Sequence, residues 1–387
     1  MLANELTAYL VPSDTVGSYP FADKKHCMGS QIIRLHDHPD ATIHPTDILI
    51  VGIDARDSDS PSNLIRKQLW GLSSIHYIKG RVFDAGNIPA NLTLAQQYQA
   101  VETISAMLAE CKAQLIFIGG TQEFTSKVYS GWRINQKFIR LAIIDCKIDW
   151  DGNYDDFHED NFVNNLMDEP YEKLVDLSFI GIQGYLTPQH IQQRVLRRKH
   201  EHIRLGNLRG NIHEAEPLLF DAHLVSIDMS AVRASDAPGL KVSNPNGLYA
   251  EEVCMLARYA GVGQNSKFFG LFGLGAIESP QKQTIMLAAQ VVWHYIEGVS
   301  HRKLENPLKN LPYNKKYVIN IDVPGIEMVF YKNEHSGNWW FELAGLNKRK
   351  LMRGKILVRC TASDYTSASN GDIPQRWMRW YQKTQKI

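Results

Sequence analysis

Short runs of apolar, largely β-branched residues recur along the chain and alternate with stretches that have helical periodicity. The runs fall at residues 47–53, 114–118, 141–145, 176–182 and 222–228. Strands that are apolar on both faces are typical of parallel sheets, because helices cover such sheets on either side. The pattern predicts a three-layer, doubly wound α/β domain built around a mostly parallel sheet.

The predicted helices lie between these runs, at residues 62–72, 93–112, 188–200, 249–260 and 280–297. The last of them opens with Pro280. Proline is favoured in the first turn of a helix, because the amide hydrogen that it lacks has no partner there. Strands and helices are therefore expected to alternate as far as about Gly298.

The character of the sequence changes after Gly298. The stretch HRKLENPLKNLPYNKK is polar, basic and interrupted by proline, as a connector would be. Beyond it, YVINID, EMVFYK and NWWFEL alternate between turn-forming residues and predict a small antiparallel sheet, and IPQRWMRWYQK predicts a short amphipathic helix. The four tryptophans of this part are expected to form its core or an oligomer interface. The predicted organisation is an N-terminal segment (1–45), an α/β domain (46–300) and a C-terminal β-rich extension (301–387).

The bulk properties exclude several classes of partner. Among 387 residues, 42 lysines and arginines nearly cancel 41 aspartates and glutamates, so the net charge of +1 gives no electrostatic case for nucleic acid. The basic stretch from Arg194 to Arg209 is expected to be a solvated helix face. No apolar run is long enough to span a bilayer, and the N-terminus lacks a signal-peptide pattern. Five scattered cysteines without a CxxC pair indicate a reduced, cytoplasmic protein.

Polar residues follow three of the predicted strands, at the carboxyl ends where open α/β sheets bind ligands. Gly119-Gly120 follows the second run, Asp145 and Asp149 follow the third, and Asp228 ends the fifth. One aspartate at such a position is usually a helix cap. Three of them beside a double glycine indicate a present or former active site, which needs a cation to balance it.

The order of these motifs is similar to that of the ureohydrolase superfamily (arginase, agmatinase and formimidoylglutamase). That family has GGDHS, then DAHxD, then SxDxDxxDP followed by APG, and this sequence has GGTQEFT, DCKID and SIDMSAVRASDAPG in the same order. The segments VGIDARDS and GLYAEEVCMLARYAG also resemble the family, so the resemblance extends from about Ile48 to Gly298. It implies an arginase-like fold, hydrolysis of non-peptide C–N bonds at two manganese ions, and possible assembly into a homo-oligomer.

The resemblance assigns six metal-ligand positions, and three of them are substituted. Three carboxylates are retained: Asp145, Asp149 and Asp228. The other three positions hold Gln122 and Lys147, each in place of a histidine, and Ser230 in place of an aspartate. Both histidines of the family site are therefore missing. The DP pair that ends the third family motif is also replaced, by Arg233-Ala234.

Lys147 brings a positive charge to a position where the family binds metal. A protonated ammonium has no lone pair to donate to a metal ion. Two unit charges ~4 Å apart interact by about 4 kcal/mol at an effective dielectric constant near 20, and a divalent ion doubles this repulsion. We therefore expect Lys147 to replace the metal by bridging Asp145, Asp149 and Asp228, with Arg233 adding a second positive charge if it points inward.

Two hypotheses about function remain open at this point. The first is a protein that has lost the manganese centre and hydrolase activity, needs no cofactor, and acts in binding, scaffolding or regulation with an unknown protein or small-molecule ligand. The alternative is an active hydrolase of a linear amidine or guanidine C–N bond. In that case Asp145, Asp149 and Asp228 hold a single weakly bound Mn²⁺ or Mg²⁺ that activates water, or Lys147 acts as a base. A lowered lysine pKa would favour the alternative.

Overall fold

The structure, a computed structural model, has a nine-stranded sheet at its centre. It describes residues 1–13, 24–55, 59–152, 156–168, 173–274, 281–321, 327–346 and 353–386. The strand order is β1-β3-β2-β4-β9-β8-β5-β6-β7, and every neighbouring pair runs parallel. The predicted parallel α/β fold is therefore confirmed.

The strands of this sheet include all five predicted runs, which appear as β2, β4, β5, β6 and β8. The short edge strands β1 and β7 were not predicted, because their exposed and half-buried residues give no apolar run. The bounds are β1 Ile32–Arg34, β2 Ile48–Ala55, β3 Val82–Pro89, β4 Gln114–Ile118, β5 Ile139–Ile144, β6 Leu174–Ile182, β7 Glu201–Arg204, β8 Leu224–Asp228 and β9 Phe268–Phe272.

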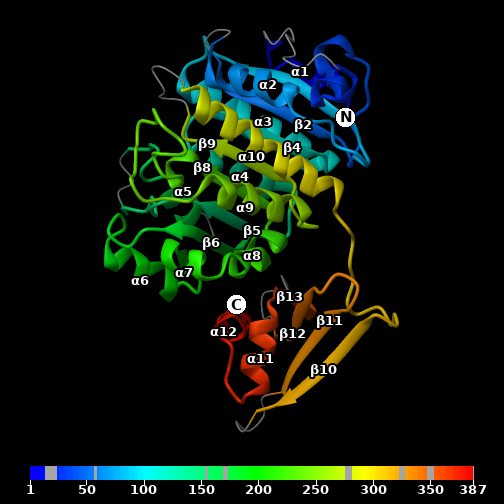
Figure 1. Ribbon diagram of the computed structural model, residues 1–387, viewed down its shortest axis with the longest axis vertical. Helices are drawn as coiled ribbons and strands as arrows, with labels where there is room; N and C mark the ends of the chain where they lie inside the picture. The colour runs from blue at the N-terminus through cyan, green and yellow to red at the C-terminus, as the bar shows by residue number, and fades with distance from the viewer. Residues whose placement is uncertain are drawn as a thin grey trace.

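Helices cover both faces of the sheet (Figure 1). On one face α10 packs against both α2 and α9, and on the other face α3 packs against α4. Pro280 lies outside the described residues, and α10 itself begins at Lys282. The helix bounds are α1 Ala3–Thr7, α2 Pro61–Gly71, α3 Leu94–Cys111, α4 Phe124–Trp132, α5 Val163–Asp168, α6 Gln189–Arg197, α7 Leu205–Gly210, α8 Glu216–Asp221, α9 Ala250–Val262 and α10 Lys282–Ser300.

The C-terminal extension forms a separate, antiparallel four-stranded sheet, which confirms the predicted small sheet. Its elements are β10 Asn314–Asn320, β11 Glu327–Asn333, β12 Trp339–Leu346, β13 Arg353–Cys360, α11 Ala362–Ser369 and α12 Gln375–Lys386. Trp339, Trp377 and Trp380 are buried together in its core. The boundaries of the three predicted segments stay a prediction, although β1, which lies within residues 1–45, pairs with β3 of the large sheet.

The extension contacts the α/β domain through α12 and β13, at the edge where β5 and β6 begin. Arg379 and Lys383 of α12 both form ion pairs with Asp176 near the start of β6, and the Arg379 pair measures 2.6 Å. Arg359 of β13 forms a 2.8 Å ion pair with Glu216 of α8. All of these pairs lie away from the carboxyl ends of the strands. In the parts of the chain that the structure describes, no helix is long and apolar enough to cross a membrane.

Candidate functional site

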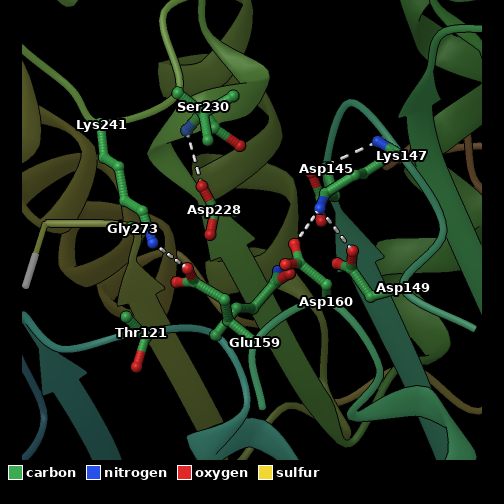
Figure 2. Close-up of a pocket in the computed structure, with 12 residues that line it drawn as sticks. Thr121, Asp145, Lys147, Asp149, Glu159, Asp160, Asp228, Ser230, Lys241 and Gly273 are labelled. Atoms are coloured by element: carbon green, nitrogen blue, oxygen red, sulfur yellow. Dashed lines mark hydrogen bonds and ion pairs between the residues drawn. The ribbon is translucent and has the colours of Figure 1, made fainter. Parts of the chain in front are cut away.

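Four strands adjacent in the sheet, β4, β9, β8 and β5, present their carboxyl ends to one pocket (Figure 2). The pocket is open to solvent and has a cavity volume of about 40 Å³. The structure thus brings together all six positions that the sequence assigned to the site. The lining residues are Thr121, Gln122, Asp145, Lys147, Asp149, Glu159, Asp160, Asp228, Ser230, Lys241, Val242 and Gly273.

Gly273, which directly follows β9, lets the backbone approach Asp228 closely. Its φ of +79° lies in the left-handed region, which side chains rarely adopt. A Cβ atom at this position would lie 2.3 Å from Asp228 Oδ1. The glycine therefore leaves room for the Asp228 carboxylate, whose Oδ1 also accepts a 2.7 Å hydrogen bond from the amide of Ser230.

Lys147 points across the pocket towards two carboxylates (Figure 2). Its Nζ lies 3.0 Å from Asp149 Oδ1 and also pairs with Asp160. The prediction that Lys147 bridges Asp145, Asp149 and Asp228 is therefore right for Asp149 and wrong for the other two, because Asp160 is its second ion-pair partner. Burial acts to lower the pKa of Lys147, but the carboxylates of Asp149 and Asp160 outweigh it and leave that pKa above its ordinary value.

The three retained aspartates are stabilised in their neutral form. Burial, with the neighbouring carboxylates of Asp149 and Asp228, holds the pKa of Asp145 well above its ordinary value. Burial raises the pKa of Asp149 to about 7, although the nearby Lys147 opposes the rise. Burial also raises the pKa of Asp228, against hydrogen bonds from Ser230. One lysine therefore does not offset the negative charge that the three carboxyl groups would carry together.

Gln122 and Ser230 line the pocket at two of the substituted positions. Gln122 is 2% exposed, and its Nε2 donates a 3.2 Å hydrogen bond to Ser226 Oγ. Its Oε1 is buried and has no hydrogen-bond partner. An unpaired acceptor of this kind disfavours the empty pocket and favours a ligand or water that donates a hydrogen bond.

Three charged residues of the pocket were not assigned to it from the sequence: Glu159, Asp160 and Lys241. Glu159 and Asp160 belong to the acidic loop after β5, and Lys241 follows the Ala237-Pro238-Gly239 segment. Lys241 Nζ lies 2.6 Å from Glu159 Oε1. The acidic composition of the loop was the only sequence signal, and it does not indicate which lysines the acids meet. His158 of this loop, 43% exposed, lies beside Asp160 and does not line the pocket.

Arg233 does not add a second positive charge to the pocket. Its side chain turns to Asp236, with an Nε to Oδ1 distance of 2.9 Å, and its guanidinium lies over the ring of Tyr249. The condition under which it would add a charge, an inward orientation, is therefore not met. Its charge is satisfied by a neighbour three residues along the chain and by an aromatic face.

The side chains of the pocket do not fit a pair of manganese ions. Among the residues that the structure describes, no group of three or more histidine, cysteine, aspartate or glutamate side chains is arranged to hold a metal ion. An amide at Gln122, a protonated amine at Lys147 and a hydroxyl at Ser230 stand where the resemblance places two imidazoles and a carboxylate. Manganese prefers imidazole and carboxylate ligands, and the ammonium repels a cation.

The fold, the order of the motifs and the position of the pocket define the class of the protein. The sequence profile of the Arginase family matches residues 48–297. The chain therefore belongs to the Arginase family, as the resemblance of its motifs predicted. A comparison with curated protein sequences gave no significant match.

Solved structures of three enzymes show the same fold. Formimidoylglutamase from Bacillus subtilis superposes with a TM-score of 0.63 at 17% identity and covers 78% of this chain and 100% of its own. Formiminoglutamase from Trypanosoma cruzi, determined with Mn²⁺, gives 0.58 at 19% identity over 66% of this chain and 94% of its own. Proclavaminate amidino hydrolase from Streptomyces clavuligerus gives 0.55 at 18% identity over 66% and 92%.

Proposed function

We propose that this Arginase-family protein has lost the two-manganese centre and the hydrolase activity, and that its pocket serves to bind a small ligand in a regulatory or scaffolding role. The observation that carries the proposal is the place of Lys147. Its ammonium stands at a family histidine position and pairs with Asp149 at 3.0 Å. A metal ion in that position would have to displace a cation that two carboxylates hold.

The state of Lys147 supports the non-catalytic role. A lysine that acts as a general base needs a lowered pKa, so that part of it is neutral near pH 7. The carboxylates around Lys147 instead leave its pKa above the ordinary value. The ammonium therefore stays charged and acts as a fixed positive charge in the pocket.

The test is the metal content of the purified protein, measured by elemental analysis after growth with added manganese and again after dialysis. Near-zero transition metal is the expected result for the natural chain. The matched control is the triple variant Gln122→His, Lys147→His, Ser230→Asp, which restores the donor types of the family. This variant is expected to retain manganese, because imidazole and carboxylate then replace the amide, the ammonium and the hydroxyl.

One or two manganese ions held tightly by the natural chain would contradict the proposal. The second candidate, an active hydrolase of an amidine or guanidine C–N bond, would then be assayed with such compounds. Its supporting observation is Asp149, whose pKa of about 7 suits a general acid or base near neutral pH. The enzymes with similar folds act on formimino and amidino compounds by their names. The five free thiols are compatible with the cytoplasmic compartment that we also propose.

A further inference from the structure

The acidic loop after β5 places two adjacent carboxylates on two lysines at opposite sides of the pocket (Figure 2). Asp160 pairs with Lys147, and Glu159 pairs with Lys241, which is 82 residues away along the chain. All four side chains line the pocket. The loop therefore spans the pocket and is attached on each side by an ion pair.

Packing and hydrogen bonds fix the conformation of this loop. The ring of Phe157 packs edge-on against Tyr98 at 5.3 Å, and the ammonium of Lys127 lies 4.1 Å above the same ring. Asn161 is 1% exposed, donates to the carbonyl of Asp156 at 2.6 Å and accepts from the amide of His158 at 2.9 Å. These contacts hold Glu159 and Asp160 at defined positions above the pocket.

The two ion pairs differ in exposure. The Lys147 side chain is 29% exposed and has a second, buried partner in Asp149, which is 5% exposed. The Lys241 side chain is 60% exposed, and Glu159 is its ion-pair partner among the described residues. Exposed pairs are weak and exchange readily with solutes, whereas partly buried pairs are held more firmly. The loop is therefore more easily released on the Lys241 side.

The charge and hydrogen-bonding groups of the pocket lining determine where an anionic group of a ligand can bind. Asp145, Asp149 and Asp228 line the pocket together, and each repels an anionic group whenever it is ionised, so such a group is disfavoured beside them. The unpaired Gln122 Oε1 requires a hydrogen-bond donor. Lys147 already has two carboxylate partners, whereas Lys241 is more exposed and pairs with Glu159, so an anionic group of a ligand is better accommodated near Lys241.

We propose that Lys241 is a carboxylate subsite at the mouth of the pocket and that Glu159 occupies it as a built-in substitute for the ligand. A carboxylate-bearing ligand takes the place of Glu159 on Lys241, and the loop then swings away from that side while Phe157 and Asp160 keep it attached. The inference rests on the proposed function in one respect, that the pocket receives a small ligand. It adds the chemical class of the group at the mouth and the residue that controls access.

The test is hydrogen–deuterium exchange of the full-length protein, read by mass spectrometry in peptides that cover residues 156–168. The probe is sodium acetate, compared with sodium chloride at the same ionic strength. Acetate is expected to accelerate exchange in this segment by roughly two- to fivefold and saturably, because it competes with Glu159 for an exposed pair. Chloride screens the Lys241–Glu159 pair but has no carboxylate group to take the place of Glu159, so it is expected to have a smaller effect.

Two variants and a matched control complete the test. Lys241→Met and Glu159→Gln are expected to show the faster exchange without any probe, and Lys241→Met is expected not to respond to acetate. Lys315→Met removes a similarly exposed pair with Glu334 in the extension and is expected to leave residues 156–168 unchanged.

Equal effects of acetate and chloride on the natural chain would overturn the carboxylate subsite. Natural-rate exchange in Lys241→Met would show that this pair does not hold the loop. Both readouts are independent of metal content, so a chain that retains manganese would refute the proposed function without deciding this inference.

Discussion

Lys147 and Asp149, two residues apart after β5, form a 3.0 Å ion pair inside the pocket where the Arginase family binds metal. Their carboxylate and ammonium groups come from positions that the family resemblance assigns to ligands of manganese. The positive charge at this position therefore belongs to a side chain, the Lys147 ammonium, whereas the family resemblance implies a bound metal ion there. Four expectations follow from this and from the other contacts described above.

Lys147→Met should destabilise the folded protein by about 1–3 kcal/mol, because Asp149 is then left buried with its negative charge less well compensated. Urea unfolding at pH 8 measures the effect. Asp160→Asn removes the other ion-pair partner of Lys147. Because Asp160 is 58% exposed, this substitution should lower the free energy of unfolding by less than about 1 kcal/mol. Equal losses for the two variants would show that the Asp149 contact is not the important one.

Gly273→Ala should destabilise the protein more than Gly337→Ala does. Both glycines have a positive φ, +79° and +76°, so both substitutions cost about 1 kcal/mol of backbone strain. Only at Gly273 does the new Cβ meet another group, Asp228 Oδ1 at 2.3 Å, whereas the space around Gly337 is open. The additional cost is expected to be about 1–3 kcal/mol. Thermal unfolding of the two variants measures the difference, and equal midpoints would contradict it.

His200 should make the protein less stable in acid. Burial, followed by the charge of Lys383, lowers the pKa of His200 to about 3, and its Nδ1 accepts a 3.2 Å hydrogen bond from the amide of Leu177. In the unfolded chain the pKa is near 6.5. Between these values the unfolded state binds the additional proton, so stability is present above pH 6.5 and is lost as pH falls towards 3.

The slope that His200 contributes is at most about 1.4 kcal/mol per pH unit over this range. His200→Gln should reduce the slope of the unfolding free energy without removing it. The second buried histidine, His223, also has a pKa lowered to about 3 by burial and by Arg140. Urea unfolding at several pH values below 6.5 measures the slope. An unchanged slope in the variant would contradict the assignment.

Asp176→Asn should weaken the attachment of the extension. Arg379 and Lys383 are both buried against Asp176, and the substitution leaves two buried cations without their shared carboxylate. Breaking a buried pair costs about 3–5 kcal/mol, whereas breaking an exposed pair costs up to about 1 kcal/mol. Limited proteolysis of the connector at residues 301–313 and urea unfolding measure the change. Glu334→Gln, which breaks an exposed pair with Lys315, is the control. Equal proteolysis of both variants would contradict a structural role for Asp176.

The sheet and the position of the pocket were predictable because the apolar runs and the polar residues at their ends are local in the sequence. Asp145 and Asp149 come shortly after β5, and Asp228 is the last residue of β8. These two strands are neighbours in the sheet, so the three aspartates lie at the same edge. The edge strands β1 and β7 gave no comparable signal, because short strands with exposed residues lack an apolar run. Family motifs supplied the remaining positions, Gln122, Lys147 and Ser230.

The ion pairs of the pocket and of the extension were not predictable. Glu159 and Lys241 are 82 residues apart, and Asp176 and Lys383 are 207 apart. No residue pattern of this one sequence indicates which distant charges meet, because charged side chains occur on every exposed loop. The same reason explains the error for Lys147, whose second partner comes from a loop that the strand pattern does not place.

Strand β5 has charged groups near both of its ends. Arg140, at its start, pairs with Asp221, and Lys147, three residues after its end, pairs with Asp149. The residues Leu141–Ile144 between them are apolar and buried. A strand of six residues is about 20 Å long. The contact with the extension and the pocket therefore lie at opposite ends of the same strand and can be altered separately. Substitutions beside α12 should change how the C-terminal extension is attached, and substitutions after Ile144 should change which ligands the pocket accepts. Because the two sites are far apart, the effects of such substitutions should be additive.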